Sequence, residues 1–423
     1  MEERERAVLV GADIGEDENF QRSMDELGEL AKACGMTVEG NVVQKMGGIS
    51  KAFCIGSGKV QEVKEYAKAL EADVIIFDNS LTPSQMRNLQ KETGKPVMDR
   101  TGLILDIFST RAKTREAKLQ VEAARLKYFM SRLVGLHDVM TRQGGASGSM
   151  SNKGAGEKKL ELDRRKIEKR LAQLNKELEE VAKERRNQGK RRAESRIPKV
   201  ALVGYTNAGK SSLMNAMIER FTPDEKETEK KVLEQDMLFA TLDTAVRNIR
   251  LVDNREILLS DTVGFIHKLP HELVKAFRST LEEVKNADLL LYVIDYSDTE
   301  YRHQIKVTEK TLLEIGAADI PVIYVYNKAD LCDMEKIPKV MGERIYMSAK
   351  TGQGTAELAQ MIQNKVYTEY IHAEFLFPYH CGEAAAYFRK NAQVLEQEYL
   401  ENGIRLKVNC HSADAGKYEK FLL

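Results

Sequence analysis

The segment GYTNAGKS, residues 204–211, combines residue types at a spacing that could bind the phosphates of a nucleotide. It fits the pattern G-x-x-x-x-G-K-S and lies between a β-branched run and a helical pattern. Backbone N–H groups between the glycines can surround the phosphates, Lys210 can reach the β and γ oxygens, and the Ser211 hydroxyl can bind Mg²⁺. These residues therefore predict a site for a nucleoside triphosphate with magnesium.

Four more short motifs follow in the order that is typical of translation-factor-type GTPases. They are FATLD at 239–243, DTVG at 261–264, NKAD at 327–330 and SAK at 348–350. Thr241 is placed to be a second ligand of Mg²⁺, Asp261 would hold a water bound to the ion, and the Gly264 N–H would meet the γ-phosphate. One such tetrapeptide could arise by chance, but five in order, each at a strand–loop junction, indicate a GTPase.

Asp330 predicts which base is bound. Its carboxylate would accept hydrogen bonds from N1–H and the exocyclic amine of guanine, whereas adenine would leave a buried carboxylate unsatisfied. Discrimination of this kind can reach about 10⁴-fold or more. We therefore expect GTP and Mg²⁺ as cofactors, with Ser211 and Thr241 as metal ligands. The expected nucleotide-binding residues are Gly204, Tyr205, Thr206, Asn207, Ala208, Gly209, Lys210, Ser211, Phe239, Ala240, Thr241, Leu242, Asp243, Asp261, Thr262, Val263, Gly264, Asn327, Lys328, Ala329, Asp330, Ser348, Ala349 and Lys350.

The residue after DTVG raises the question of how water would be activated. Phe265 stands where the best-known GTPases have a glutamine that orients the attacking water, and an apolar side chain cannot polarise water. The protein is then either a GTP-gated binding module or an enzyme whose water is positioned by another group. The residues expected to act in hydrolysis are Asn207, Lys210, Thr241 and Gly264.

Asn207 is one candidate for that other group. It occupies the position that binds K⁺ in potassium-dependent relatives of this GTPase class, where a cation would offset the charge that develops between the β- and γ-phosphates. The alternative role for Asn207 is a hydrogen bond that only shapes the loop.

The elements around these motifs predict an α/β protein with several domains. Residues 1–110 alternate short β-branched runs with helical patterns, which predicts a small α/β domain with a mainly parallel sheet. Its strands are expected at 6–13, 37–45 and 72–78, and its helices near 19–34, at 58–70 and after Thr82. The other expected parts are a long antiparallel helical hairpin with a Gly-rich tip loop (111–195), a P-loop GTPase domain (196–366) and a small C-terminal α/β domain (367–423), in which residues 383–400 have a helical pattern.

Two segments of the expected hairpin carry apolar residues at coiled-coil spacing. They are Leu119, Ala123, Leu126, Met130 and Leu133, and then Leu160, Ile167, Leu171, Leu174, Leu178 and Val181. The stretch 142–156 between them is rich in Gly and Ser and has no periodicity, which predicts two long helices joined by a flexible tip. A linker beside a solvated helix is the alternative.

The second arm of the hairpin is basic. Sixteen Lys and Arg residues stand against nine Asp and Glu residues between Lys153 and Arg196, in a chain with no net charge. Such a surplus is typical of a surface that binds a phosphate backbone, although many charge runs are only solvated helix faces. The expected RNA-binding residues are Lys158, Lys159, Arg164 and Arg165.

Composition limits the class of protein. The five cysteines are dispersed without a C-x-x-C pair, which favours a reducing cytosol over a disulfide or zinc framework. The longest apolar run, near 287–294, is far shorter than the roughly 20 residues of a membrane span. We therefore expect a cytoplasmic protein with no membrane span, no signal peptide and no DNA partner.

The GTPase motifs, the Gly-rich tip and the segment DRTGLILDIFSTRAKTREAKLQVEAARLKY (99–128) together resemble the HflX family of ribosome-associated GTPases over nearly the whole chain. The resemblance implies docking on the large ribosomal subunit and its rRNA in the GTP state, and the splitting of stalled or idle ribosomes into subunits. We expect a monomer with slow intrinsic hydrolysis that the ribosome stimulates. The alternatives are a GTP-gated RNA- or ribosome-binding scaffold with little turnover and a ribosome-assembly GTPase.

The tip departs from the family pattern, which usually reads close to G-P-G-E-T-Q-L-E-T-D-R-R. Here it is GAGEKKLELDRR at 154–165, so Ala155 replaces the proline, Lys158 and Lys159 replace Thr-Gln, and Leu162 replaces a threonine. Added lysines favour phosphate contacts, which position a partner without reading its sequence. The lost side-chain donors could change which RNA feature is recognised.

Overall fold

The computed structural model describes residues 4–17, 19–142, 150–193, 197–222, 238–239, 245–251, 255–268, 283–334, 336–367 and 370–423. The chain forms two compact units. The first contains Met1–Lys190, Gln235–Asp243 and Ile266–Ser279, and the second contains Arg191–Glu234, Thr244–Phe265 and Thr280–Leu423. Among the helices in the described ranges, none has the length and apolar character needed to span a membrane.

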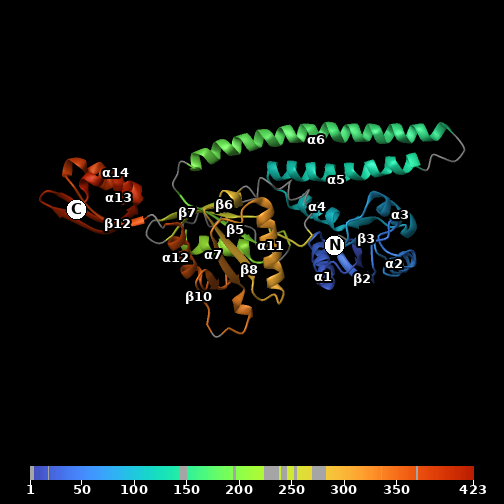
Figure 1. Ribbon diagram of the computed structural model, residues 1–423, viewed down its shortest axis with the longest axis horizontal. Helices are drawn as coiled ribbons and strands as arrows, with labels where there is room; N and C mark the ends of the chain where they lie inside the picture. The colour runs from blue at the N-terminus through green and yellow to red at the C-terminus, as the bar shows by residue number, and fades with distance from the viewer. Residues whose placement is uncertain are drawn as a thin grey trace. The chain divides into compact units, whose positions relative to one another are not determined.

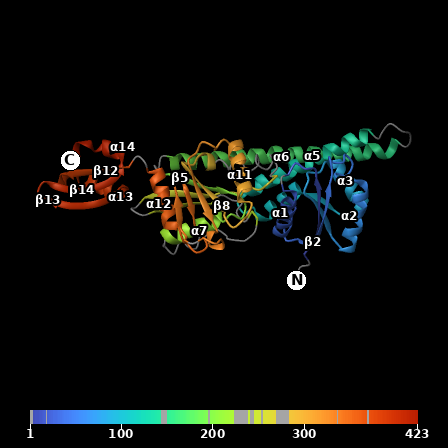
Figure 2. The ribbon, with the colours of Figure 1, turned by 60° about the horizontal axis from the view of Figure 1, so that its bottom comes forward.

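The α/β domain of the first unit has a four-stranded parallel sheet in the order β2-β1-β3-β4 (Figure 1). Its strands are β1 (Arg6–Asp13), β2 (Thr37–Lys45), β3 (Val74–Phe77) and β4 (Val97–Asp99), and its helices are α1 (Phe20–Ala33), α2 (Ser57–Ala69), α3 (Pro83–Thr93) and α4 (Arg100–Arg111). Helices α2 and α3 pack together and α1 packs with α4, so that the two pairs cover opposite faces (Figure 2). The prediction of a parallel α/β domain is confirmed.

The hairpin is fixed to this domain by Asp99, which is fully buried at the end of β4. The Asp99 carboxylate caps α4 by accepting from the Gly102 N–H (2.9 Å). It also accepts from the Tyr128 hydroxyl (2.7 Å) and from Arg132 (2.6 Å), both on the first hairpin helix. Charge-assisted hydrogen bonds of this kind are about twice as strong as neutral ones. One carboxylate therefore joins the sheet, α4 and the middle of the first hairpin helix.

The hairpin consists of α5 (Arg115–Arg142) and α6 (Met150–Ala193). Arg115 pairs with Glu177 and Glu122 pairs with Arg170, so residue numbers fall along one helix as they rise along the other, and the helices are antiparallel. Their apolar seam contains Leu119, Ala123, Leu171 and Leu174, with Leu126, Met130, Ile167, Leu178 and Val181 packed against it. This confirms the coiled-coil spacing for these nine residues. The side chains of Leu133 and Leu160 lie outside the described part of the chain.

The tip loop ends earlier in the structure than the sequence predicted. It was placed at 142–156, but α6 already begins at Met150. Once a helix is nucleated, each added residue gains a backbone hydrogen bond, and a glycine costs only about 1 kcal/mol relative to alanine. Gly154 and Gly156 therefore do not end the helix. Residues 143–149 lie outside the described part of the chain.

The GTPase domain in the second unit has a seven-stranded sheet in the order β10-β11-β9-β8-β5-β7-β6. The strands are β5 (Lys199–Gly204), β6 (Ala245–Arg250), β7 (Glu256–Asp261), β8 (Leu289–Asp295), β9 (Val322–Asn327), β10 (Lys339–Met341) and β11 (Arg344–Tyr346), and the helices are α7 (Lys210–Phe221), α11 (Tyr301–Ile315) and α12 (Thr355–Val366). Strands β7, β5, β8, β9 and β11 are parallel. Their carboxyl ends therefore meet at one edge, where ligands bind in sheets of this class.

The C-terminal part corrects one prediction. The expected helix over 383–400 ends early: α13 covers Gly382–Asn391, and β13 (Gln393–Leu400) follows it as a strand. β13 forms a hairpin with β14 (Gly403–His411), which also pairs with β12 (Tyr370–Phe377). Glu401 and Asn402 form the two-residue turn before Gly403, whose φ is +151°. Cross-strand pairing outweighed the helical periodicity of this segment.

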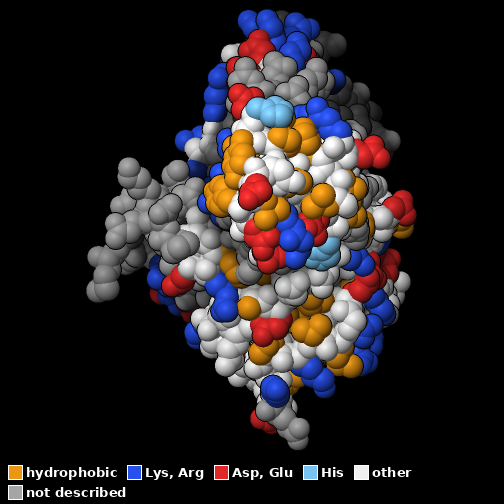
Figure 3. Space-filling view, turned by 90° about the vertical axis from the view of Figure 1, so that its left-hand side faces the viewer, with side chains coloured by type: hydrophobic (Ala, Val, Ile, Leu, Met, Phe, Trp, Pro, Cys, Tyr) orange, Lys and Arg blue, Asp and Glu red, His pale blue; other side chains and the backbone are white. Residues whose placement is uncertain are grey.

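The outer face of this small sheet carries ion pairs between strands. Arg405 on the central strand bonds both Glu374 and Glu398, and Lys407 bonds Glu396. The space-filling view toward this end of the chain accordingly shows basic and acidic side chains next to one another (Figure 3). With the two signs paired, this face has no basic patch of the kind that binds a phosphate backbone.

Candidate functional site

Close contacts require both glycines at the ends of the loop that follows β5. Gly204 has φ +146°, and a Cβ there would lie 2.1 Å from the carbonyl oxygen of Val293. Gly209 has φ +89°, and a Cβ there would lie 2.2 Å from Nδ2 of Asn327. The backbone can therefore pass close to its neighbours and turn into α7, whose first N–H groups have no acceptor within the helix and can bind an anion.

Lys210, the first residue of α7, is held at this loop. Its Nζ donates to the carbonyl oxygens of Gly204 (3.1 Å) and Tyr205 (2.6 Å). An ammonium has three protons, so these bonds orient the side chain and leave one donor for a phosphate. Burial lowers the pKa of Lys210 to about 8, although the nearby charge of Asp261 acts in the opposite direction. A bound phosphate would stabilise the charged form of Lys210 and so raise its pKa.

Two residues expected around Mg²⁺ lie side by side. The Ser211 hydroxyl at the start of α7 donates to Oδ2 of Asp261 at the end of β7 (2.7 Å). Asp261 is fully buried. A hydroxyl and a carboxylate are the oxygen donors that Mg²⁺ prefers, so this pair fits the ion. Thr241, the other expected ligand, lies outside the described residues, as do Ala240, Leu242 and Asp243.

The segment after β7 packs against the phosphate-binding loop. A Cβ on Gly264 would lie 2.8 Å from Cα of Thr206 and 3.0 Å from Nζ of Lys210, so only glycine fits there. Phe265 then pairs with the loop through its backbone: its N–H donates to the Gly204 carbonyl (3.1 Å), and its carbonyl accepts from the Thr206 N–H (2.8 Å). The Phe265 side chain is only 2% exposed. It is a packing residue and contributes no polar group to hydrolysis.

Asn327 fastens two loops at the base-binding end. Its Nδ2 donates to the carbonyl of Ala208 in the phosphate-binding loop (2.9 Å). Its Oδ1 accepts from the N–H of Ala349 in the SAK segment (2.9 Å). Lys328, with φ +60°, pairs with Asp295 at the end of β8 (2.7 Å). The structure thus brings together the first, fourth and fifth motifs.

Asp330 follows in a short 3-10 helix, Ala329–Leu331, and is exposed. In the protein alone its carboxylate is open to solvent, so a bound base would have to cover it. Ser348 is fully buried, and Lys350 is exposed on the neighbouring loop. The role predicted for Asp330 in selecting guanine would therefore require the ligand itself to desolvate this carboxylate.

Asn207 is exposed in the middle of the phosphate-binding loop. Its φ is +60°, a left-handed conformation that asparagine tolerates better than most residues. Among the described contacts, its side chain has no hydrogen bond that would shape the loop. The amide is therefore available to a ligand, and the backbone conformation offers a second reason for an asparagine here.

The expected RNA-binding residues are only partly described. Arg164 and Arg165 are exposed on α6, and Arg164 pairs with Glu168 (2.9 Å). The side chains of Lys158 and Lys159 lie outside the described part of the chain.

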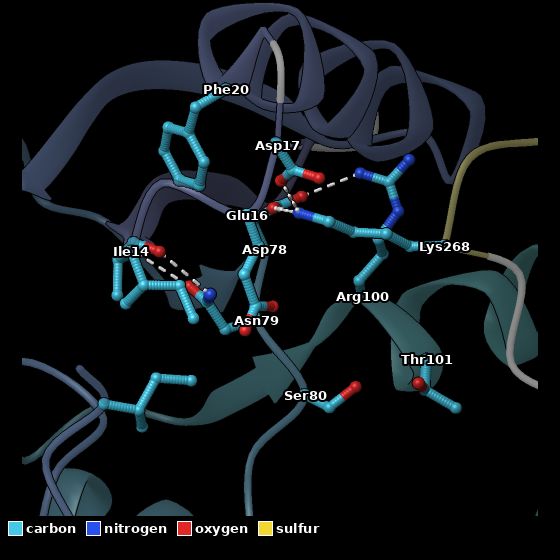
Figure 4. A pocket seen from close by; sticks show the side chains of 12 residues that line it. Ile14, Glu16, Asp17, Phe20, Asp78, Asn79, Ser80, Arg100, Thr101 and Lys268 are labelled. Atoms are coloured by element: carbon cyan, nitrogen blue, oxygen red, sulfur yellow. Dashed lines mark hydrogen bonds and ion pairs between the residues drawn. The ribbon is translucent and has the colours of Figure 1, made fainter. Parts of the chain in front are cut away.

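Two contacts made by residues near the GTPase motifs were not predicted from the sequence. Lys268, four residues after Gly264, donates to Ser23 and to Asp78 of the α/β domain (Figure 4). The ring of Phe239, from the FATLD motif, packs edge-on against Phe108 of α4, with 4.7 Å between ring centroids. Residues up to 245 positions apart in the chain make these contacts, so neither spacing nor periodicity could reveal them.

Three protein-family models match consecutive parts of the chain. Residues 21–109 match the family described as GTP-binding GTPase N-terminal. Residues 111–192 match GTP-binding GTPase Middle Region, and residues 199–328 match 50S ribosome-binding GTPase.

Individual relatives match over nearly the full length. The chain is 45% identical to the GTPase HflX of Caldanaerobacter subterraneus subsp. tengcongensis over 410 residues, which cover 96% of this chain and 92% of that protein. It is 38% identical to the GTPase HflX of Escherichia coli, with 94% and 91% covered. Among solved structures, it is similar to a GTP-binding protein from the archaeon Sulfolobus solfataricus in complex with GDP, at 24% identity and a TM-score of 0.44, with 86% and 99% covered.

Proposed function

Because this chain belongs to the GTPase HflX family, and so hydrolyses GTP, we propose that it binds the large ribosomal subunit and its rRNA in the GTP state and splits stalled or idle ribosomes into subunits. The observation that carries the proposal is the match across the α/β domain, the hairpin and the GTPase domain together. A GTPase domain alone would be compatible with many partners. We further propose that the protein acts as a monomer in the cytoplasm.

For GTP, the chain supplies charge and orientation. Lys210, fixed by two carbonyl oxygens, presents its ammonium to the phosphates. Ser211 and Thr241 would bind Mg²⁺, and Asp261 would hold a water bound to the ion. Mg²⁺ would neutralise charge that develops on the phosphates during transfer to water. We propose that the N–H of Gly264, which is packed beside Lys210, meets the γ-phosphate. We propose Lys210, Thr241, Gly264 and Asn207 as the residues that act in hydrolysis.

Slow intrinsic hydrolysis follows from Phe265. Its ring is buried and its backbone is bonded to the loop, so it cannot orient water. We propose that a K⁺ ion held in part by Asn207 compensates the developing charge, and that ribosome binding completes the site. In support, Asn207 is exposed and makes no competing side-chain hydrogen bond among the described residues.

The tip of the hairpin is the proposed docking element for rRNA. Lys158, Lys159, Arg164 and Arg165 lie near the start of α6, and the last two are exposed. Phosphate contacts release counterions, so each one should add roughly 0.7–0.9 to the slope of log affinity against log salt.

The test is sedimentation with ribosomal subunits in the presence of a GTP analogue or GDP. The protein should pellet with large subunits only with the analogue, and Lys158→Glu with Lys159→Glu should release it and flatten the salt slope. The matched control is Lys176→Glu with Lys183→Glu, which reverses two charges on the same helix. Both lysines are exposed, and they lie about 26–36 Å further from the tip at 1.5 Å per residue. If both double variants bind alike, or if deletion of 144–155 leaves binding intact, the tip is not the docking element.

A further inference from the structure

The sheet of the GTPase domain carries a group of tyrosines on one face. Val325 of β9 and Ile345 of β11 belong to the core that the sheet forms with α7 and α12. Successive side chains of a strand point to opposite faces, so Tyr326 and Tyr346 point to the other face. On that side α11 packs against β5 and β8, and β9, β11 and β10 continue the sheet to its edge (Figure 1).

Strand pairing places six side chains of this face in two rows across β9, β11 and β10. The rows are Tyr326, Tyr346 and Lys339, and then Tyr324, Arg344 and Met341. Residues that pair directly across neighbouring strands lie side by side on the same face. Each row therefore combines at least one aromatic ring with a cation.

Two tyrosines that follow β8 extend the first row. Tyr296 lies edge-on to Tyr346 (5.1 Å between ring centroids) and to Tyr326 (5.7 Å). Tyr301, at the start of α11, lies 5.6 Å from Tyr296. Tyr326 and Tyr346 are stacked, with 4.7 Å between centroids and 15° between planes. We call these four residues the tyrosine platform.

The platform is not a closed core. Tyr296, Tyr301 and Tyr346 are half-buried, and Met341 in the neighbouring row is 53% exposed. A tyrosine enclosed in a protein usually bonds its hydroxyl to a protein group. Within the described part of the chain, the hydroxyls of Tyr296, Tyr326 and Tyr346 make no hydrogen bond. These polar tips are therefore left for solvent or a ligand.

The cations at the platform are not neutralised by neighbours. Lys339 and Arg344 lie in the two rows, and the Arg302 guanidinium lies 5.8 Å from the ring centroid of Tyr301. All three cations are exposed, and none is in an ion pair with another described residue. Burial raises the pKa of Tyr326, and the charge of Arg344 acts in the opposite direction, as expected for a guanidinium near this ring.

The acids nearby leave this charge available. Glu309 and Glu343 lie near Tyr324, and Glu343 is paired with Lys365 of α12. Rings interleaved with cations on an open sheet suit unpaired RNA, because bases stack on the rings while phosphates contact the cations. Paired RNA keeps its bases inside the helix and cannot offer them for stacking.

We propose that the tyrosine platform, together with Arg302, Lys339 and Arg344, binds a run of unpaired RNA nucleotides. This places an RNA contact in the GTPase domain, in addition to the docking proposed for the hairpin tip, and it does not depend on that tip. The nucleotide bases supply the stacking surface, and the backbone supplies the charge.

The test measures binding of a labelled RNA of about eight unpaired nucleotides, and of the same RNA paired with its complement. All proteins are full-length and carry Lys158→Glu and Lys159→Glu, so that the proposed tip contacts do not contribute. Tyr301→Leu with Tyr346→Leu should weaken the unpaired RNA about tenfold and leave the paired RNA unchanged, because only stacking is lost. Tyr346→Phe keeps the ring and should bind as the parent does.

The charge is tested by Arg344→Glu, which should lower the slope of log affinity against log salt by about 0.7 for unpaired RNA. Its matched control is Arg220→Glu, an exposed position on α7 at the opposite face of the sheet, which should leave the slope unchanged. GDP affinity should be the same in all variants, which reports an intact GTPase domain.

Unchanged binding of unpaired RNA by the leucine variant, or an equal loss of both RNAs, would overturn the proposal. Loss of ribosomal-subunit binding with unchanged RNA binding would also overturn it, because the face would then bind a protein. If the leucine variant loses GDP as well, Arg344→Glu decides, and an unchanged salt slope there refutes the RNA contact.

Discussion

Replacement of Asn327 by alanine tests how far one side chain holds the nucleotide site together. Asn327 is 2% exposed and makes two hydrogen bonds of 2.9 Å, one to the Ala208 carbonyl and one from the Ala349 N–H. Both backbone partners are buried, at 0% and 6% exposure. The variant therefore leaves one buried acceptor and one buried donor without a partner.

The expected loss is about 3 kcal/mol. A buried polar group left unsatisfied costs about 1–3 kcal/mol, and there are two such groups, of which water entering the truncated site would satisfy part. With a urea m-value of about 2 kcal/mol/M, the unfolding midpoint of the GTPase domain should fall by about 1.5 M. GDP affinity should fall as well, because the phosphate-binding loop and the SAK segment are no longer fastened to each other.

The measurement needs a signal from this domain alone, because a chain with several domains does not unfold in two states. The protein has no tryptophan, so Phe221→Trp, at a partly buried position against the GTPase core, supplies one in both proteins. The control is Asn364→Ala, which removes an exposed hydrogen bond with Gln360 on α12 and should cost less than about 0.5 kcal/mol. A loss below about 1 kcal/mol for Asn327→Ala would refute the reasoning.

Three further predictions concern the ligand. Asp330→Asn should weaken GTP and admit xanthosine nucleotides, because an amide cannot offer guanine two acceptor sites; equal affinities of the unchanged protein for ATP and GTP would contradict this role. Turnover should be faster in K⁺ than in Na⁺, and both Asn207→Ala and Asn207→Gly should abolish the difference; if the glycine variant, which tolerates φ +60°, keeps it, the amide is not a ligand. The pKa of Lys210 is about 8 in the free protein, and phosphates favour its charged form. GTP binding should therefore take up about half a proton at pH 8, and affinity should fall about fivefold between pH 8 and 9. Calorimetry in buffers of different ionisation enthalpy measures this uptake, and its absence would rule out the shifted lysine.

The elements of the α/β and GTPase domains could be predicted because local pattern and tertiary environment agree there. Strands at 6–13 and 37–45 were predicted with the bounds of β1 and β2. β1 is a nearly continuous apolar run, as is typical of a buried parallel strand, whereas β2 is an edge strand with mostly half-exposed or exposed residues. The hairpin seam followed from heptad spacing alone. In such segments the chain has only one way to bury its apolar side chains.

Predictions failed where pairing or solvation decided the outcome. Residues 393–400 have a helical pattern but form a strand, because β14 offers them a partner across a two-residue turn. Asp330 belongs to a recognisable motif, but its exposure in the protein alone was not predicted, because it depends on how the neighbouring loops fold. The contacts of Lys268 join residues from distant parts of the chain, and charged residues at such separations carry no periodicity. The identity of site residues was therefore easier to predict than their burial or partners.

The length of α6 has a mechanical consequence. Its 44 residues span about 66 Å at 1.5 Å per residue, and the seam with α5 makes the two helices bend as one rod. Because Tyr128 and Arg132 fix this rod to the α/β domain, the two move together: each degree by which they tilt about a point near Ala193 moves Met150 by about 1 Å. A tilt of 5°, small enough to escape notice at the base, would carry the far end through about 6 Å, twice the length of a hydrogen bond. Spectroscopic labels near Met150 would therefore show a larger displacement than labels near Ala193 for the same tilt.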